Sequence, residues 1–202
     1  MTLTKLQRVT ILIQYLIKTS NEGILMKIIK SIFYSCFLFS IIGCSNSPDL
    51  ELYKEQTPKL DLQNYFTGPI KAWGLVQDRS GNVVRRFDVD MVGSWEGNIG
   101  TLDEDFRYYD GETQKRIWTI KKISNTEYQG TAEDILDNAE ARVKGNAMQW
   151  IYQMDLPVGD NTYRITFDDW MFLMNDGVLI NRSYLKKFGI TVAELTLFMQ
   201  KQ

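Results

Sequence analysis

From Ile70 to the end of the chain, short stretches of alternating apolar and polar residues follow one another, separated by turn-forming residues. Alternation at every second residue predicts strands with one buried face, and Asp-Gly or Ser-Gly-Asn sequences predict tight turns between them. The pattern predicts about nine strands, at residues 70–77, 83–92, 99–108, 113–123, 127–135, 141–156, 162–173, 178–185 and 191–200. A helical turn is expected within 134–142, and a short helix or turn at 60–66.

Consecutive strands joined by short turns predict an antiparallel meander, because a tight turn pairs each strand with the next. A sheet of this length closes or splits into two layers, since exposed edges would pair with other chains. We therefore predict an all-β fold over residues 60–202, an up-and-down barrel similar to the lipocalin (calycin-like) and fatty-acid-binding families. A flattened β-sandwich is the alternative.

The segment 26–44 carries the features of a bacterial lipoprotein signal peptide. Lys27 and Lys30 are followed by an uncharged apolar run at 31–42 and then by Gly43-Cys44. The run is too short for a transmembrane helix, which needs about 20 apolar residues, and it suits the apolar core of a signal peptide. The resemblance predicts a signal helix at 26–43, and at Cys44 a diacylglycerol and an N-acyl chain that anchor the protein in a membrane.

The remaining N-terminal residues complete the predicted organisation. Residues 1–25 precede the signal and are interpreted as an upstream over-call of the start, with Met26 as the true first residue. An amphipathic helix on the membrane is the alternative for 1–25. The polar stretch 44–59 is interpreted as a tether. Ser45 follows the lipidated cysteine, and by resemblance the absence of Asp there favours an outer-membrane, periplasm-facing protein.

The composition excludes several classes of function. The chain has no histidine and two cysteines, so it cannot form a Ser-His-Asp triad, a Cys-His dyad or a His-ligated metal site. Its net charge is −2, and residues 45–202 alone carry −6. This balance argues against a nucleic-acid partner. We predict no cofactor and no metal site.

The predicted inner faces of the strands contain a few charged residues among apolar ones. Buried charges are costly unless they are paired, so these positions form either a structural ion network or a binding cavity. In a cavity, an arginine would meet the carboxylate or phosphate of an amphiphile while aromatic residues hold its tail. A β-bulge at Asp168-Asp169 would turn Asp168 inward instead of Asp169. The candidate ligand-binding residues are Arg85, Glu104, Arg116, Trp118, Trp150, Tyr152, Asp169 and Arg182.

Seven short motifs stand out along the mature chain, at 71–74, 77–81, 102–106, 110–112, 167–171, 180–182 and 187–189. As a set they resemble the uncharacterised proteobacterial lipoprotein family called domain of unknown function 3833, over about residues 44–200. The resemblance implies an envelope lipoprotein and brings no established activity, substrate or catalytic residue.

Three functions are consistent with these features. The first is an outer-membrane-anchored periplasmic lipoprotein whose barrel binds a lipid or another hydrophobic or amphiphilic anionic ligand. The second is a structural or accessory envelope protein that acts through its surface, without a ligand and without catalysis. The third is a histidine-free enzyme that uses Glu104, Asp169 and arginine residues. We predict no catalytic residue, which favours the first two.

Overall fold

The computed structural model describes residues 48–202, so the predicted signal helix and Cys44 lie outside the described residues. Residues 49–202 form one compact unit. In chain order its elements are η1 (Leu50–Tyr53), α2 (Leu62–Tyr65), β1 (Gly68–Asp78), β2 (Val83–Glu96), β3 (Ile99–Tyr108), β4 (Thr113–Lys122), β5 (Glu127–Thr131), β6 (Ile135–Lys144), β7 (Ala147–Val158), β8 (Asn161–Leu173), η2 (Asn175–Gly177), β9 (Val178–Lys187) and β10 (Ile190–Lys201).

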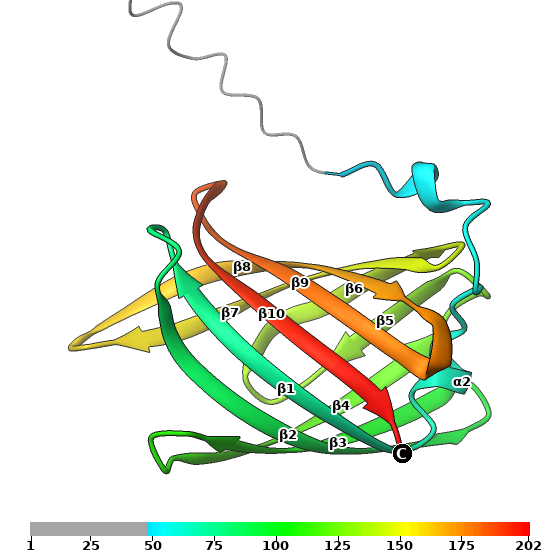
Figure 1. The fold of residues 1–202 in the computed structure, drawn as a ribbon, viewed down its shortest axis with the longest axis horizontal. Coiled ribbons are helices and arrows are strands. Elements are labelled where there is room, and N and C mark those ends of the chain that lie inside the picture. Colours follow the sequence, from blue (N-terminus) through cyan, green and yellow to red (C-terminus); the bar gives the residue numbers. More distant parts are fainter. Residues whose placement is uncertain (1–47) are drawn as a thin grey trace, which may run out of the picture. The chain divides into compact units, whose positions relative to one another are not determined.

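The strands form the predicted closed antiparallel barrel (Figure 1). Each strand pairs with the next in sequence, and β10 closes the barrel by pairing with β1 from Ile70↔Lys201 to Asp78↔Ala193. This is the up-and-down, lipocalin-like arrangement, and the sandwich alternative is excluded because the sheet is continuous. The closed sheet leaves no free edge.

The structure has ten strands in the described region where the sequence analysis predicts about nine. The difference arises at Gly145-Asn146, where a turn divides the predicted strand 141–156 into β6 and β7. Gly145 has a φ of +56°, which glycine adopts without steric cost. The helical turn expected within 134–142 is wrong. Most of that segment lies in β6, whose pairing with β7 shifts register between Leu136 and Glu140, and Asp137 has a positive φ at this irregularity.

Of the short helix or turn expected at 60–66, the structure shows the helix, α2, which covers one end of the barrel (Figure 1). The Asp61 carboxylate accepts a hydrogen bond from the Asn64 amide at 2.8 Å and so caps the helix N-terminus. Tyr65 and Phe66 are buried in the barrel core. The Trp95 indole N–H donates to the Phe66 carbonyl at 2.9 Å, which fixes the helix to β2. We call this end the α2 end.

Residues 49–59, which fall within the predicted tether, pack on the outer face of the barrel. Leu50 in η1 is buried against Ala147 and Trp170, and the Tyr53 ring lies 5.2 Å from the Phe172 ring. Trp170 is an outward residue of β8, and this contact makes it one of the most buried side chains of the protein. The predicted tether is therefore part of the folded unit from Asp49 onward.

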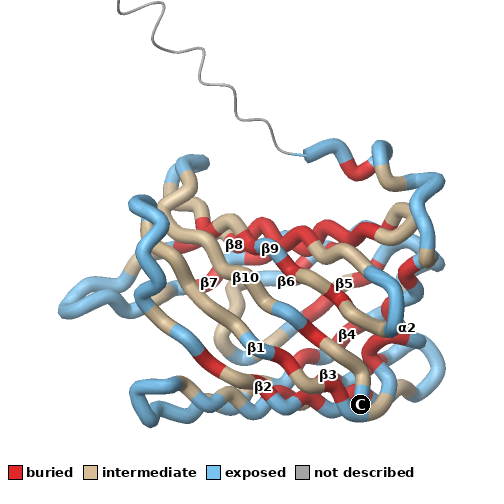
Figure 2. The backbone as a smooth tube through the Cα atoms, viewed as in Figure 1, coloured by how far each residue is buried: buried red, intermediate tan, exposed pale blue. Residues whose placement is uncertain are grey.

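Burial alternates along the strands as a half-buried sheet requires (Figure 2). In β2, for example, Phe87, Val89 and Met91 are buried while the residues between them are more exposed. The inward residues of all ten strands, together with those of α2, form one hydrophobic core.

Candidate functional site: an interior cavity

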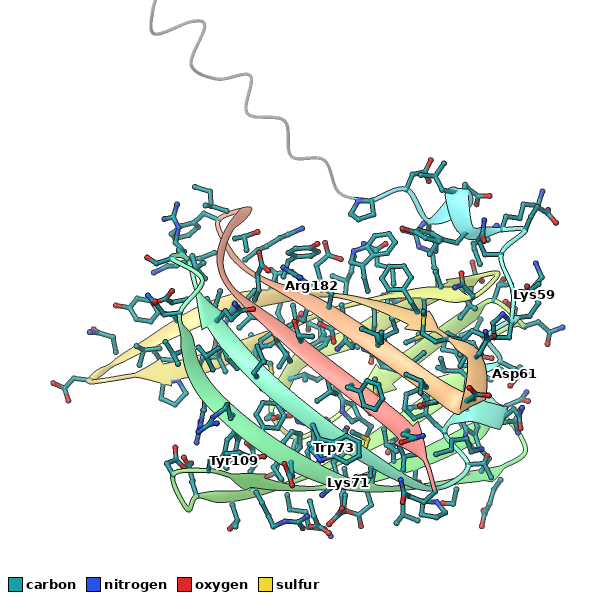
Figure 3. All side chains as sticks on the ribbon, viewed as in Figure 1. Lys59, Asp61, Lys71, Trp73, Tyr109 and Arg182 are labelled. Atoms are coloured by element: carbon teal, nitrogen blue, oxygen red, sulfur yellow. The ribbon has the colours of Figure 1, made fainter. Side chains whose placement is uncertain are left out.

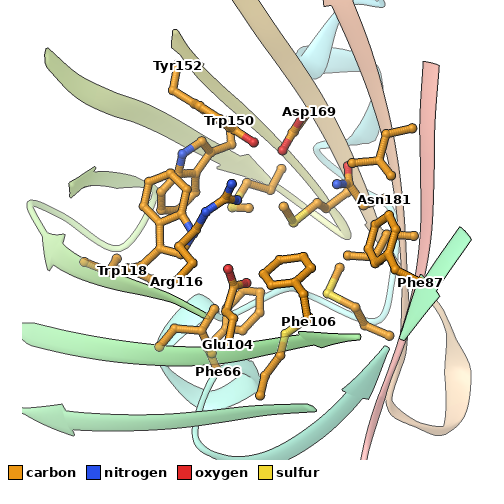
Figure 4. A pocket seen from close by; sticks show the side chains of 18 residues that line it. Phe66, Phe87, Glu104, Phe106, Arg116, Trp118, Trp150, Tyr152, Asp169 and Asn181 are labelled. Carbon is orange, nitrogen blue, oxygen red and sulfur yellow. The ribbon is translucent and has the colours of Figure 1, made fainter. Parts of the chain in front are cut away.

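A cavity of about 100 Å³ lies inside the barrel, lined by 18 side chains (Figure 4). Phe66 contributes from the α2 end, and the other residues come from the inward faces of β2, β3, β4, β7, β8, β9 and β10. Most of the wall is apolar and consists of Phe66, Phe87, Met91, Leu102, Phe106, Ile120, Met148, Met171, Leu195, Leu197 and Met199.

Six of the eight predicted site residues line this cavity. Strand alternation places them there, because each occupies the same parity as the buried apolar residues of its own strand. Three carry charge and three are aromatic: Glu104, Arg116, Asp169, Trp118, Trp150 and Tyr152.

The three aromatic residues pack against one another on one wall of the cavity. The Trp118 ring lies edge-on to Trp150 at 5.4 Å and to Tyr152 at 5.3 Å, and Tyr152 stacks on Phe167 at 4.9 Å. Gly130 on β5 makes room for this wall, because a Cβ there would lie 2.4 Å from the Trp150 ring. The sequence therefore provides space for two indoles by omitting a side chain on β5, the neighbour of β4.

Arg116 projects from β4 into the cavity and is held by an acidic residue of a turn. Its Nε and Nη2 atoms donate to Asp134 Oδ2 at 2.9 and 2.7 Å. Asp134 lies between β5 and β6, at the end of the barrel opposite α2. The guanidinium also lies over the Phe106 ring, 5.5 Å from its centroid. Arg116 is therefore anchored on the side of the cavity that is remote from α2.

Glu104 lies directly opposite Arg116 in the β3–β4 ladder, and its side chain is buried. Its Oε2 atom has no hydrogen-bond partner among the described residues. Burial raises the pKa of Glu104 to about 7, and the positive charge of Arg116 opposes part of that rise. Glu104 is therefore a buried carboxyl group with one oxygen that the described residues leave without a partner.

Asp169 is a second buried carboxyl group, on β8 between Trp150 of β7 and Ser183 of β9. Its Oδ1 atom has no hydrogen-bond partner within residues 48–202, and neither does Oδ1 of nearby Asn181. Burial raises the pKa of Asp169 to about 6, while Ser183 and Arg116 oppose this rise. The β7–β8 pairing runs without a bulge, so Asp169 faces inward as predicted and Asp168 faces outward.

Comparison with known proteins identifies the family of the chain. The model of a family described as "Protein of unknown function (DUF3833)" matches residues 38–201, most of the chain. The chain belongs to this family. Comparison with curated proteins gives no match.

One solved structure similar to this DUF3833 protein is the S-type phycobiliprotein lyase CPES from Guillardia theta. The similarity covers 77% of this chain and 99% of the lyase, with 7% sequence identity and a TM-score of 0.48. At this level the likeness carries neither ligand nor activity to the DUF3833 protein.

Two of the predicted site residues lie elsewhere in the DUF3833 barrel. Arg85 is on the inner face of β2 but at the end opposite α2, where it stacks on the Tyr108 ring at 3.5 Å and pairs with Glu112. Arg182 lies on the outer face of β9, where it pairs with Glu194 (Figure 3). Neither arginine lines the cavity.

The predicted inward placement of Arg182 is wrong because the outer face of β9 is itself partly apolar. Tyr184, an outward residue of β9, packs near Trp170 and the η1 segment. The true inner face includes Asn181 and Ser183, which are both buried. The sequence analysis placed Asn181 and Ser183 on the outer face, because these two polar residues alternate with the more apolar set Ile180, Arg182 and Tyr184. The residues that flank them, Leu179 and Leu185, carry the signal for the correct face.

The arrangement can accept hydrogen bonds inside an apolar chamber. Glu104, Asp169 and Asn181 supply acceptor oxygens, and Arg116 supplies one anchored positive charge. Within residues 48–202, no group of three acidic or cysteine side chains comes close enough together to hold a metal ion. The chemistry that these side chains support is recognition of the polar end of a small molecule.

Proposed function

We propose that this DUF3833 protein is an outer-membrane lipoprotein that faces the periplasm and binds a lipid or another hydrophobic or amphiphilic small molecule inside its barrel. The observation that carries the proposal is the interior cavity, whose apolar walls surround a few buried polar atoms without partners. Protein interiors are close-packed, so a chamber among large aromatic side chains needs a reason. Apolar walls with a few convergent polar groups are typical of small-molecule sites.

The size of the cavity limits the group that it can hold. An engineered cavity of about 150 Å³ holds benzene, so about 100 Å³ suits a short alkyl segment or part of a small ring. Four methionines, Met91, Met148, Met171 and Met199, lie in the wall. Methionine is flexible and adapts to irregular shapes, so these side chains can move aside to admit a whole benzene ring or a longer tail.

Tryptophan residues provide a direct test of binding in the cavity. The full chain, labelled with 5-fluorotryptophan and held in phosphatidylcholine nanodiscs if it purifies with membranes, is titrated with benzyl alcohol and followed by ¹⁹F NMR. We expect saturable shifts at Trp118 and Trp150, which line the cavity. Trp73, which is exposed on the outer wall, and Trp170, which lies under η1, serve as internal controls and should not shift. Absence of a saturable shift at the cavity residues would contradict ligand binding there.

The anchoring part of the proposal rests on the sequence at 26–44. The predicted signal ends at Gly43-Cys44, and the folded unit begins at Asp49, five residues after Cys44. No helix within residues 48–202 is long and apolar enough to cross a membrane. The support for a lipid anchor is thus the position of Cys44 directly after a short apolar run.

A matched pair of chains tests the anchor. The full chain and the variant Cys44→Ser are expressed in a Gram-negative host with radiolabelled palmitate, and the outer and inner membranes are separated by density. We expect label only in the protein with Cys44, and recovery of that protein in the outer-membrane fraction. Equal labelling of the serine variant would contradict lipidation at Cys44, and recovery in the inner membrane would contradict the location.

The alternative of an accessory protein acting through its surface has one specific observation in its favour. Exposed apolar side chains gather on the hairpins at the end opposite α2, at Val84, Tyr109, Val158, Phe188 and Ile190, and Phe188 is 93% exposed. A photo-crosslinking residue at position 188 would test it, with position 92 on the barrel wall as control. A discrete crosslinked partner at 188 alone would favour this function, and crosslinks at neither position would count against it.

A further inference from the structure

The buried charged groups of the cavity are not balanced, because acidic side chains outnumber basic ones. Two carboxylates, Glu104 and Asp169, line it together with one cation, Arg116. Glu104, Asp169 and Asn181 are each more than nine-tenths buried, at 7, 5 and 3% exposure. Each has one oxygen atom without a hydrogen-bond partner in the part of the chain that the structure describes. Among the described residues that line the cavity, three acceptor oxygens lack partners, against one donor, the indole N–H of Trp150.

Arg116 does not compensate both carboxylates. Its Nε and Nη2 atoms donate to Oδ2 of Asp134, a third carboxylate outside the cavity lining. Neither Glu104 nor Asp169 lies within ion-pair distance of any basic group among residues 48–202. An uncompensated buried charge is costly. An occupant with positive charge would lower this cost, and an anionic occupant would raise it.

The aromatic wall also suits a positive charge. Arg116 already lies 5.5 Å from the Phe106 ring centroid and 5.9 Å from that of Trp118. The faces of aromatic rings attract cations through their quadrupoles, most strongly for tryptophan. Trp150 and Tyr152 extend this wall towards Asp169 (Figure 4).

We propose that the ligand of this cavity carries a cationic hydrogen-bond donor, such as a primary ammonium group, that Glu104 and Asp169 accept. The apolar part of the ligand lies against Phe87, Leu195 and Leu197, which line the same cavity. This inference rests on the proposed function and assigns the polar end of its ligand. It replaces the anionic end that the sequence analysis predicts, because two of the three candidate arginines lie outside the cavity and the third is paired.

Three probes that share one ring and differ in charge test the proposal. Benzylammonium, benzyl alcohol and benzoate are titrated separately into the fluorotryptophan-labelled full chain at pH 7.5, with empty nanodiscs as a partition reference. The midpoint of the Trp118 and Trp150 shifts gives each affinity. We expect benzylammonium to bind at least tenfold more tightly than benzyl alcohol, and benzoate to bind more weakly than either.

The outcomes separate this inference from the proposed function. Equal affinity for benzyl alcohol and benzylammonium would overturn the cationic assignment and leave the apolar cavity intact. Tightest binding of benzoate would overturn it in favour of an anion at Arg116. Failure of all three probes to shift Trp118 and Trp150 would overturn the proposed function, and this inference with it.

Two conservative variants locate the recognition. Glu104→Gln and Asp169→Asn each remove a carboxylate at nearly constant volume, so each should lose most of the preference for benzylammonium over benzyl alcohol. Asp105→Asn, one residue along β3 on the outer face, is the matched control and should keep the full preference. A preference for benzylammonium that survives in both cavity variants would overturn the assignment. If a variant fails to fold, the comparison of the three probes in the wild-type chain still tests the charge preference.

Discussion

Glu104 and Arg116 face each other across the β3–β4 ladder, yet the Arg116 guanidinium donates to Asp134 and leaves Glu104 Oε2 without a partner in the described residues. Asp134, in the turn between β5 and β6, thus pairs with Arg116 in place of Glu104 on the neighbouring strand. This relationship leaves an unsatisfied carboxyl group at the cavity wall.

Breaking the Arg116–Asp134 pair should cost more stability than breaking a surface pair. Arg116→Met keeps the length of the side chain but leaves Asp134 and Glu104 without a cation. The side chains of Arg116 and Asp134 are 16 and 30% exposed, and removal of one partner of a mostly buried pair leaves a poorly compensated charge. We therefore expect the free energy of unfolding in urea to fall by about 2 kcal/mol.

The barrel offers a matched control for this measurement. Arg182→Met breaks the pair with Glu194 on the outer face, where the two side chains are 46 and 32% exposed. An exposed pair contributes at most about 1 kcal/mol. Equal losses of unfolding free energy in Arg116→Met and Arg182→Met would contradict a larger cost for breaking the Arg116–Asp134 pair.

Stability should fall as pH rises through the range in which the two cavity carboxyls ionise. Burial raises the pKa of Glu104 from 4.5 to about 7 and that of Asp169 from 3.8 to about 6. Between the unfolded and folded values the native state binds more protons than the unfolded chain, so the free energy of unfolding decreases with rising pH. We expect these two groups to lower it by a few kcal/mol between pH 4 and pH 7.

Chemical denaturation of the wild type and of Glu104→Gln/Asp169→Asn at several pH values measures this contribution. The double variant lacks both titrating groups and should lose less stability than the wild type over the same range. Arg116, Asp134 and Asp168 also act electrostatically on the two carboxyls and are unchanged in the variant. An identical pH dependence in both chains would contradict the raised pKa values.

The contact between η1 and the barrel should hold the segment 49–59 in place. Leu50→Ala removes a buried side chain that packs on Ala147 and Trp170, and we expect a loss of about 2 kcal/mol. Amide hydrogen exchange of residues 49–59 should accelerate, because the segment loses its main apolar contact. Leu52→Ala is the control, since Leu52 is 72% exposed and its truncation should change stability by about 0.5 kcal/mol or less. Similar exchange in both variants would contradict docking through Leu50.

Gly130 should be intolerant of a side chain because of the indole opposite it. In Gly130→Ala the new Cβ would lie 2.4 Å from the Trp150 ring and 3.2 Å from that of Trp118, so both rings must shift. We expect a loss of about 1–3 kcal/mol and altered ¹⁹F resonances of the two tryptophans. Thr131→Ala, at the adjacent exposed position of β5, should leave both resonances unchanged. Unaltered resonances in Gly130→Ala would contradict the packing of this wall.

Much of the site follows from strand periodicity. Because inward residues recur at every second position, the apolar neighbours of Glu104, Arg116 and Asp169 reveal that these charges face the core. The same rule fails at β9, where both faces carry apolar residues. There the face is decided by contacts with η1 and the rest of the barrel, which no local pattern contains.

The sequence by itself determines the all-β class, the hairpin order and the parity of most strands, since turn chemistry and period-two alternation are local properties. Barrel closure between β1 and β10, the cover that η1 forms over Trp170 and the pairing of Arg116 with Asp134 were decided only by the tertiary structure. Each of these contacts joins residues that are distant in sequence or that lie on a turn. Packing of the whole barrel decides which groups come within contact distance of one another. It brings Asp134 to Arg116 and leaves Glu104 and Asp169 each with an oxygen that has no partner in the described residues.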